Sequence, residues 1–161
     1  MGLEPFLGFH TEEFATKNIA LNKPARMSSM RKQFRAGNGV DGMLTNLVHT
    51  RKSDTEWWCV DLGKVYDFQS VVLYNRRNKN KALINRLAGF ELKFSYNGHC
   101  DFETFNGSPV CYKDTESIGQ LVYNITKCNE PVCLSSRFIF ISPRSKQYLN
   151  FVELMVYELE E

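Results

Sequence analysis

The chain has 161 residues, of which 43% are hydrophobic and 13% aromatic, and it contains five cysteines. Its 20 Lys and Arg residues nearly balance 18 Asp and Glu residues, and a net charge of +2 is too small to predict nucleic-acid binding. The length and composition predict one folded domain with its own core and exclude a disordered chain, a collagen-like chain and a coiled coil. The sequence has no apolar run of about 18 residues, so no membrane span is predicted.

The N-terminal segment gives the first prediction in chain order. It has no basic start and no long apolar run, so no signal peptide is predicted in this segment. Residues 1–17 show no periodicity and are expected to form an N-terminal arm, which leaves residues 18–161 as the folded domain. If the chain is complete, this start indicates a cytosolic protein.

The remaining sequence has the periodicity of β-strands. Phe90, Leu92 and Phe94 alternate with polar residues, which predicts a strand with one buried and one wet face. The strand from Trp57 is expected to end at Gly63, and the only helical candidate is 54–57. Strands at short intervals without a long helical pattern predict an all-β sandwich. The predicted strands are 57–62, 68–74, 90–95, 121–125, 138–141 and 151–157.

Sequons and cysteines favour an extracellular compartment over the cytosolic interpretation. Asn124 and Asn106 each begin a glycosylation sequon. Four of the five cysteines lie between positions 100 and 133, which is typical of disulfides that close loops in secreted domains. The chain is therefore expected to be secreted or to be the ectodomain of a larger protein.

Five sequence blocks, in their order, resemble the discoidin domain family and its fucolectin branch. These blocks are Asn18–Ala25 with Ser28-Ser29, Val40–Gly42, His49-Thr50, Trp57–Gly63 and Arg86–Glu91. The resemblance covers residues 18–157, and it implies an eight-stranded jelly-roll β-sandwich of the galactose-binding-like kind. It also implies a non-enzymatic lectin that binds fucose or another cell-surface glycan.

The resemblance places a sugar site on His49, Arg76 and Arg86. Arginine offers several donors in a rigid fork, and neutral histidine donates from one nitrogen and accepts at the other. Fucolectins carry two adjacent cysteines between the two arginines, and their disulfide packs on the sugar. Here that loop has no cysteine and is three residues longer, so the sugar specificity can differ from fucose.

The resemblance also implies a structural calcium ion close to the loop that presents His49. Asp41 and Glu153 match the carboxylate ligands of the family, and the backbone carbonyls would come from Asn38, Met43 and Asn46. Calcium takes about 6–8 oxygen ligands, and a tight loop supplies carbonyls without adding charge.

The cysteines allow three pairings of the four that lie close together. Cys111 and Cys128 match a loop-closing pair of the family, and Cys100 can pair with Cys133 around it. Cys59, in the strand of the two tryptophans, is expected to be a lone thiol.

Basic residues give the alternative interpretation. Five cations lie between Arg76 and Arg86, and further cations lie in the loops around Arg31 and Lys52, which the fold is expected to bring to one end. Such a cluster attracts anionic ligands, so the alternative is an interaction module for proteins, anionic glycans or phospholipids that has lost sugar binding. No catalytic motif is present, so an enzyme is not expected. Because single lectin domains bind weakly, an oligomer would raise the avidity.

Overall fold

The computed structural model describes residues 17–160, so all but Lys17 of the expected N-terminal arm lies outside the described residues. The described residues form nine strands: β1 (Ala25–Met27), β2 (Val48–Ser53), β3 (Trp58–Tyr74), β4 (Glu91–Ser95), β5 (Val110–Lys113), β6 (Val122–Ile125), β7 (Ser135–Ser142), β8 (Gln147–Phe151) and β9 (Glu153–Glu158). Their short helical segments are η1 (Ala36–Val40), α2 (Lys81–Ile84), η2 (Asn85–Leu87) and α3 (Phe102–Gly107).

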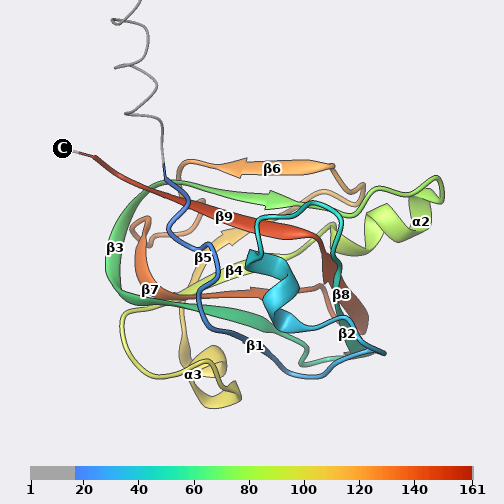
Figure 1. The fold of residues 1–161 in the computed structure, drawn as a ribbon, viewed down its shortest axis with the longest axis horizontal. Helices are drawn as coiled ribbons and strands as arrows, with labels where there is room; N and C mark the ends of the chain where they lie inside the picture. The colour runs from blue at the N-terminus through green and yellow to red at the C-terminus, as the bar shows by residue number, and fades with distance from the viewer. Residues whose placement is uncertain (1–16, 161) are drawn as a thin grey trace, which may run out of the picture.

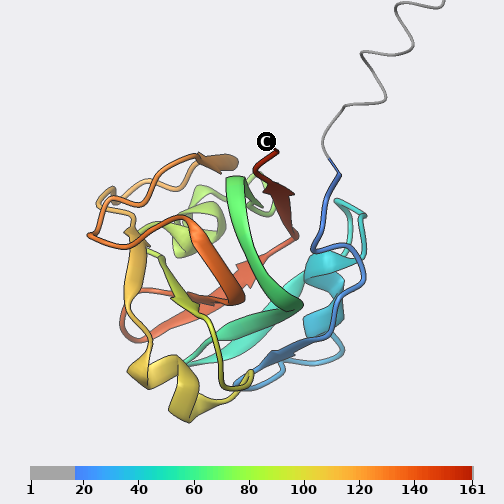
Figure 2. The same ribbon diagram turned by 90° about the vertical axis from the view of Figure 1, so that its left-hand side faces the viewer.

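Strand β3 takes part in both layers of the sandwich. Its first half pairs with β1 and β7, and β7 continues that layer through β4 to β5. Its second half pairs with β6 and β9, while β2 and β8 form a separate two-stranded sheet. All pairings are antiparallel, and Figures 1 and 2 show the layers from two directions. The all-β sandwich is confirmed, with nine strands in the described residues where the resemblance implies eight.

The expected end of a strand at Gly63 is wrong, because the chain continues through this position as β3. Gly63 has a φ of +94°, a left-handed conformation that glycine adopts without a steric penalty. The register with β7 shifts between Asp61 and Tyr66, so the glycine lies in an irregular bulge within one strand. β7 pairs with β3 on both sides of this bulge, and the partners of β3 change to β9 from Phe68 and to β6 from Val71.

The core lies between the layers and follows the predicted alternation in β4, where Leu92 and Phe94 are buried. Residues 138–141 of β7 are buried on both faces of their layer, as expected. Trp58 is fully buried, and its indole N–H donates a hydrogen bond to the Ala36 carbonyl oxygen at 2.9 Å. This bond joins the core to η1 and thereby to the segment that precedes β2.

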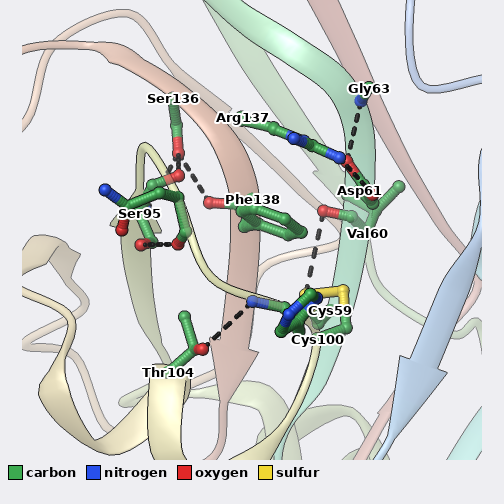
Figure 3. Close-up of polar contacts among 12 residues, drawn as sticks. Cys59, Val60, Asp61, Gly63, Ser95, Cys100, Thr104, Ser136, Arg137 and Phe138 are labelled. Carbon is green, nitrogen blue, oxygen red and sulfur yellow. Dashed lines mark hydrogen bonds and ion pairs between the residues drawn. A yellow bond between two sulfur atoms is a disulfide. The ribbon is translucent and has the colours of Figure 1, made fainter.

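The disulfides correct two of the expected cysteine states. The bond between Cys111 and Cys128 is confirmed. Cys59, expected to be a lone thiol, is bonded to Cys100 (Figure 3). The pairing of Cys100 with Cys133 is therefore wrong, and Cys133 is free and exposed.

Strand alternation explains this correction. Trp58 and Val60 belong to the main core, so Cys59 between them points to the other face of the layer. There it packs with Cys100 and Phe105 in a second apolar cluster. The segment from β4 to α3 covers this outer face, and Figure 3 shows the disulfide beside α3 and β7.

One end of the sandwich gathers β2, β8 and α2, at the right of Figure 1. The apolar run predicted as one strand over 151–157 is divided at Val152 into β8 and β9, so that β8 can pair with β2. The helix expected at 54–57 is also wrong, since a turn and irregular chain occupy these positions. No helix in residues 17–160 is long and apolar enough to span a membrane.

Candidate functional site

His49 lies in β2 at this end of the sandwich and is 1% exposed. Its ring stacks on Phe34, with 5.9 Å between ring centroids, and meets Tyr148 edge-on at 5.2 Å. The Nδ1 atom lies 2.7 Å from the carbonyl oxygen of Thr50. A carbonyl oxygen can only accept, so Nδ1 carries the proton and Nε2 of the neutral ring is left as an acceptor.

The charge state of His49 follows from its surroundings. Burial lowers the pKa of His49 below its ordinary value of 6.5, although the hydrogen bond to Thr50 opposes this effect. The positive charges of Arg31, Arg86 and Arg76 lower the pKa further. The ring is therefore neutral at physiological pH, and three arginines lie close enough for their charges to act on it.

Arg76 follows β3 and is half-buried. The side chain of Asn75 holds its backbone in place. The Asn75 amide nitrogen donates to the carbonyl oxygens of Ile84 and Gln120, at 2.9 and 3.0 Å, and its oxygen accepts from the Arg76 backbone N–H at 2.8 Å. The buried Asn75 side chain thus closes the loop that joins Arg76 to η2. Burial lowers the pKa of Arg76, and the charges of Arg86 and Arg31 lower it further.

Three cations surround the ring of Tyr148. The guanidinium carbon of Arg86 lies 4.6 Å from the ring centroid and that of Arg31 5.5 Å, while the Lys52 ammonium lies 5.7 Å away. The Arg31 backbone N–H also donates to the His49 carbonyl oxygen at 2.9 Å, which holds the two residues side by side. The expectation that these three basic loops share one end is confirmed.

The longer loop between the two predicted arginines contains α2. Asn80 caps this helix by accepting from the Ala82 N–H at 2.9 Å, and Asn78 accepts from the Asn80 N–H at 2.9 Å. Ile84 lines a hollow of about 400 Å³ together with Asn78 and Leu121. An apolar surface is therefore present in the loop that lacks the family's adjacent cysteines.

The carboxylates of the expected calcium site lie together. Glu153 is fully buried at the start of β9, and its Oε2 accepts from the Gly42 N–H at 2.8 Å. Its Oε1 is buried without a hydrogen-bond partner. Burial and the neighbouring Asp41 carboxylate raise the pKa of Glu153 to about 8, against the opposing effect of the Gly42 hydrogen bond.

The loop after Asp41 is organised around its carboxylate. The Met43 N–H and the Asn46 amide donate to the two Asp41 oxygens, at 2.9 and 2.7 Å. The Asn38 amide donates instead to the Leu47 carbonyl oxygen at 3.0 Å. Within residues 17–160, no group of three or more His, Cys, Asp or Glu side chains is arranged to hold a metal, so a cation here needs backbone carbonyls as well.

The family model of the F5/F8 type C kind, described as a NedA-like, galactose-binding domain, matches residues 38–133. The matched span is more than half of the chain. The chain belongs to this family. The resemblance to discoidin-type domains is thereby confirmed, and the carbohydrate-binding modules and lectins of the galactose-binding-like family are the proteins with which this domain is to be compared.

Solved structures of lectins have the same fold as this F5/F8 type C domain. A histidine mutant of the lectin-binding domain of lectinolysin, complexed with Lewis b, is 26% identical, with a TM-score of 0.70, and the match covers 90% of this chain and 98% of that one. A fucolectin from striped bass (Morone saxatilis) serum is 24% identical, with a TM-score of 0.73; the match covers 91% of this chain and 48% of the fucolectin chain. A Streptococcus pneumoniae fucose-binding module is 22% identical, with a TM-score of 0.67 and coverage of 91% and 98%. No curated protein sequence matches the chain.

The solved relatives and the two disulfides give information about enzyme activity and cellular location. The F5/F8 type C domain resembles non-catalytic lectin and carbohydrate-binding modules, and such modules can sit within enzymes. Two disulfides in a lectin-like domain are consistent with an extracellular location. Of the two sequon residues, Asn124 is exposed in β6 and Asn106 is exposed in α3.

Three residues at the site of this F5/F8 type C domain were not predicted from the sequence. Phe34 and Tyr148, which enclose His49, are single aromatic residues without a motif. Asn150 lies opposite His49 in the β2–β8 register and is fully buried, with neither amide atom partnered. A polar residue within an apolar strand was the one available signal for it.

Proposed function

We propose that this domain is a non-catalytic lectin that binds a fucosylated or similar glycan through His49, Arg76 and Arg86. The observation that carries the proposal is the neutral His49 acceptor lying beside guanidinium groups that form no ion pair within residues 17–160. A sugar hydroxyl can donate to Nε2 of His49 while it accepts from an arginine. Vicinal hydroxyls can bridge two such donors.

The comparison with lectinolysin supports the class of ligand. Its lectin domain is 26% identical to this chain over nearly its full length and was solved with the Lewis b antigen. Lewis b and free fucose are therefore the first probes. The aromatic and aliphatic side chains at this end, Phe34, Tyr148 and Ile84, supply apolar surface for the C–H faces of a sugar.

The test measures Lewis b binding by calorimetry for His49→Ala and Arg76→Ala. We expect each variant to lose about 10- to 100-fold in affinity, because each removes a hydrogen bond to a charged or buried group. Thermal melts should show that both variants remain folded. His99→Ala and Arg26→Ala are matched controls on exposed residues outside this end of the sandwich and should bind normally.

Two results would contradict the proposal. A glycan array with no binding by the wild-type domain would leave a protein-interaction module as the function. Normal binding by folded His49→Ala would move the glycan to another part of the surface.

We also propose that a structural calcium ion binds between Asp41 and Glu153. The buried, unpartnered Oε1 atom of Glu153 and the adjacent Asp41 carboxylate fit a hard cation, because two neighbouring carboxylates repel each other without one. The carbonyls of Asn38, Met43 and Asn46 would complete the ligand set. The ion would neutralise the carboxylates and stabilise the loop that leads into β2 and His49.

A further inference from the structure

Arg31, Lys52 and Arg86 form a cationic cluster around Tyr148 that a neutral sugar does not require. Their distances to the ring centroid are 5.5, 5.7 and 4.6 Å. The described residues contain two ion pairs, Lys113–Glu91 and Arg137–Asp61, and neither involves this cluster. The three cations thus lie around one aromatic ring, and none of them is in an ion pair within the described residues.

Such a cluster costs free energy when nothing anionic lies beside it. Like charges at close range destabilise each other. Burial is the main cause of the lowered pKa values of His49 and Arg76, and the charges of Arg31 and Arg86 lower both further. An anion between these groups would remove the repulsion. Guanidinium groups also match the oxygen pairs of carboxylates and sulfates with two parallel hydrogen bonds.

The position of the cluster says which part of a glycan would be anionic. Tyr148 lies against the edge of the His49 ring, so the cluster borders the site proposed for the first sugar. Arg31 and Lys52 are both exposed and come from different segments, the loop before η1 and the strand β2. They are placed to meet a substituent on the next sugar.

We propose that the preferred ligand is an anionic glycan, whose carboxylate or sulfate ester lies against Arg31, Lys52 and Arg86. This inference rests on the proposed lectin function and adds the charge of the ligand. The anion can be the carboxylate of a sialic acid or the sulfate ester of a sulfated sugar, and the experiment distinguishes these two sources.

The experiment compares Lewis a, sialyl Lewis a and 3′-sulfo Lewis a by calorimetry. We expect at least one anionic form to bind about tenfold more tightly than Lewis a, which corresponds to about 1.4 kcal/mol. The advantage should shrink between about 0.1 and 1 M NaCl, because the screening length falls from about 10 to 3 Å. The arm that shows the larger advantage identifies the anion.

Variants show which residues cause the preference for the anionic glycan. Arg31→Gln and Lys52→Gln should bring the ratio of anionic to neutral affinity close to one. Lys64→Gln is the matched control, since Lys64 lies 4.9 Å from the Tyr66 ring on another part of the surface, and it should keep the wild-type ratio. A wild-type ratio near one with measurable Lewis a binding would overturn this inference and leave the lectin function intact. No binding of any of the three would overturn this inference, and the lectin function would then be decided by the Lewis b titration.

Discussion

At the scale of single residues, the protonation of His49 should set the pH range of glycan binding. Binding needs Nε2 as an acceptor, and protonation would replace this acceptor with a further cation beside Arg31, Arg76 and Arg86. Because the folded-state pKa lies below 6.5, we expect Lewis b affinity to fall on acidification from pH 8 with a midpoint below pH 6.5. Calorimetry across this range gives the midpoint.

A second variant distinguishes this titration from acid unfolding. His49→Gln keeps an acceptor that does not titrate, so any binding it retains should not decline over the same pH interval. A wild-type midpoint above 6.5, or an equal decline in the variant, would mean that His49 is not the titrating group.

What the sequence could predict at this scale depended on the resemblance. His49, Arg76 and Arg86 were placed by motif and spacing, and Arg31, Arg76 and Arg86 all lie close enough to affect the pKa of His49. Tyr148 could not be found, because its contact with His49 depends on the pairing of β2 with β8 and on the register shift within that pair. Pairing between distant strands leaves no local signal.

At the scale of elements, the disulfide between Cys59 and Cys100 joins β3 to the segment before α3. The two residues are 41 positions apart, and closing a loop of this size stabilises a fold by about 2–4 kcal/mol. We therefore expect the double variant Cys59→Ala/Cys100→Ala to lose about that much free energy of unfolding. Denaturant melts measure the loss.

Cys133 supplies the matched comparison for this prediction. It is exposed and unbonded, so Cys133→Ser should change the free energy of unfolding by less than about 0.5 kcal/mol. If Cys133→Ser were instead the more destabilising substitution, the bond between Cys59 and Cys100 would be contradicted.

Strand β3 shows why element boundaries were the weaker part of the sequence prediction. Gly63 was a correct signal of unusual backbone, since its φ is positive. Whether such a glycine makes a turn or a bulge depends on the partner strand, and β7 pairs with β3 on both sides of it. The outward direction of Cys59 follows from strand alternation, but its partner depends on which segment covers that face.

At the scale of the whole molecule, the sandwich was predictable because burial between two layers imposes apolar alternation on each strand. The arrangement of the loops was not predictable in this way. Asp41 and Glu153 are far apart in the sequence, and the Gly42 hydrogen bond shows them meeting beside the loop that leads to β2. Only the resemblance linked the two carboxylates before the structure placed them.

The proximity of Asp41 and Glu153 should make the stability of the whole domain depend on both pH and calcium. The pKa of Glu153 is raised from 4.5 to about 8 in the fold. A raised pKa means that the protonated carboxyl stabilises the folded state, fully below pH 4.5, and that this contribution is lost as the pH rises to about 8. Each pKa unit between the two values corresponds to about 1.4 kcal/mol of free energy of unfolding.

In chelator, we therefore expect the melting temperature to fall as the pH rises from 4.5 to 8. Calcium should restore it most strongly at pH 8, because an ion that binds only the native state raises its stability. Glu153→Gln should remove both the pH slope and the calcium response, while Glu158→Gln, an exposed carboxylate in the same strand, should retain them. Calorimetric melts that show no calcium response at pH 8 would exclude the ion, and a pH slope retained in Glu153→Gln would assign the buried titration to another group.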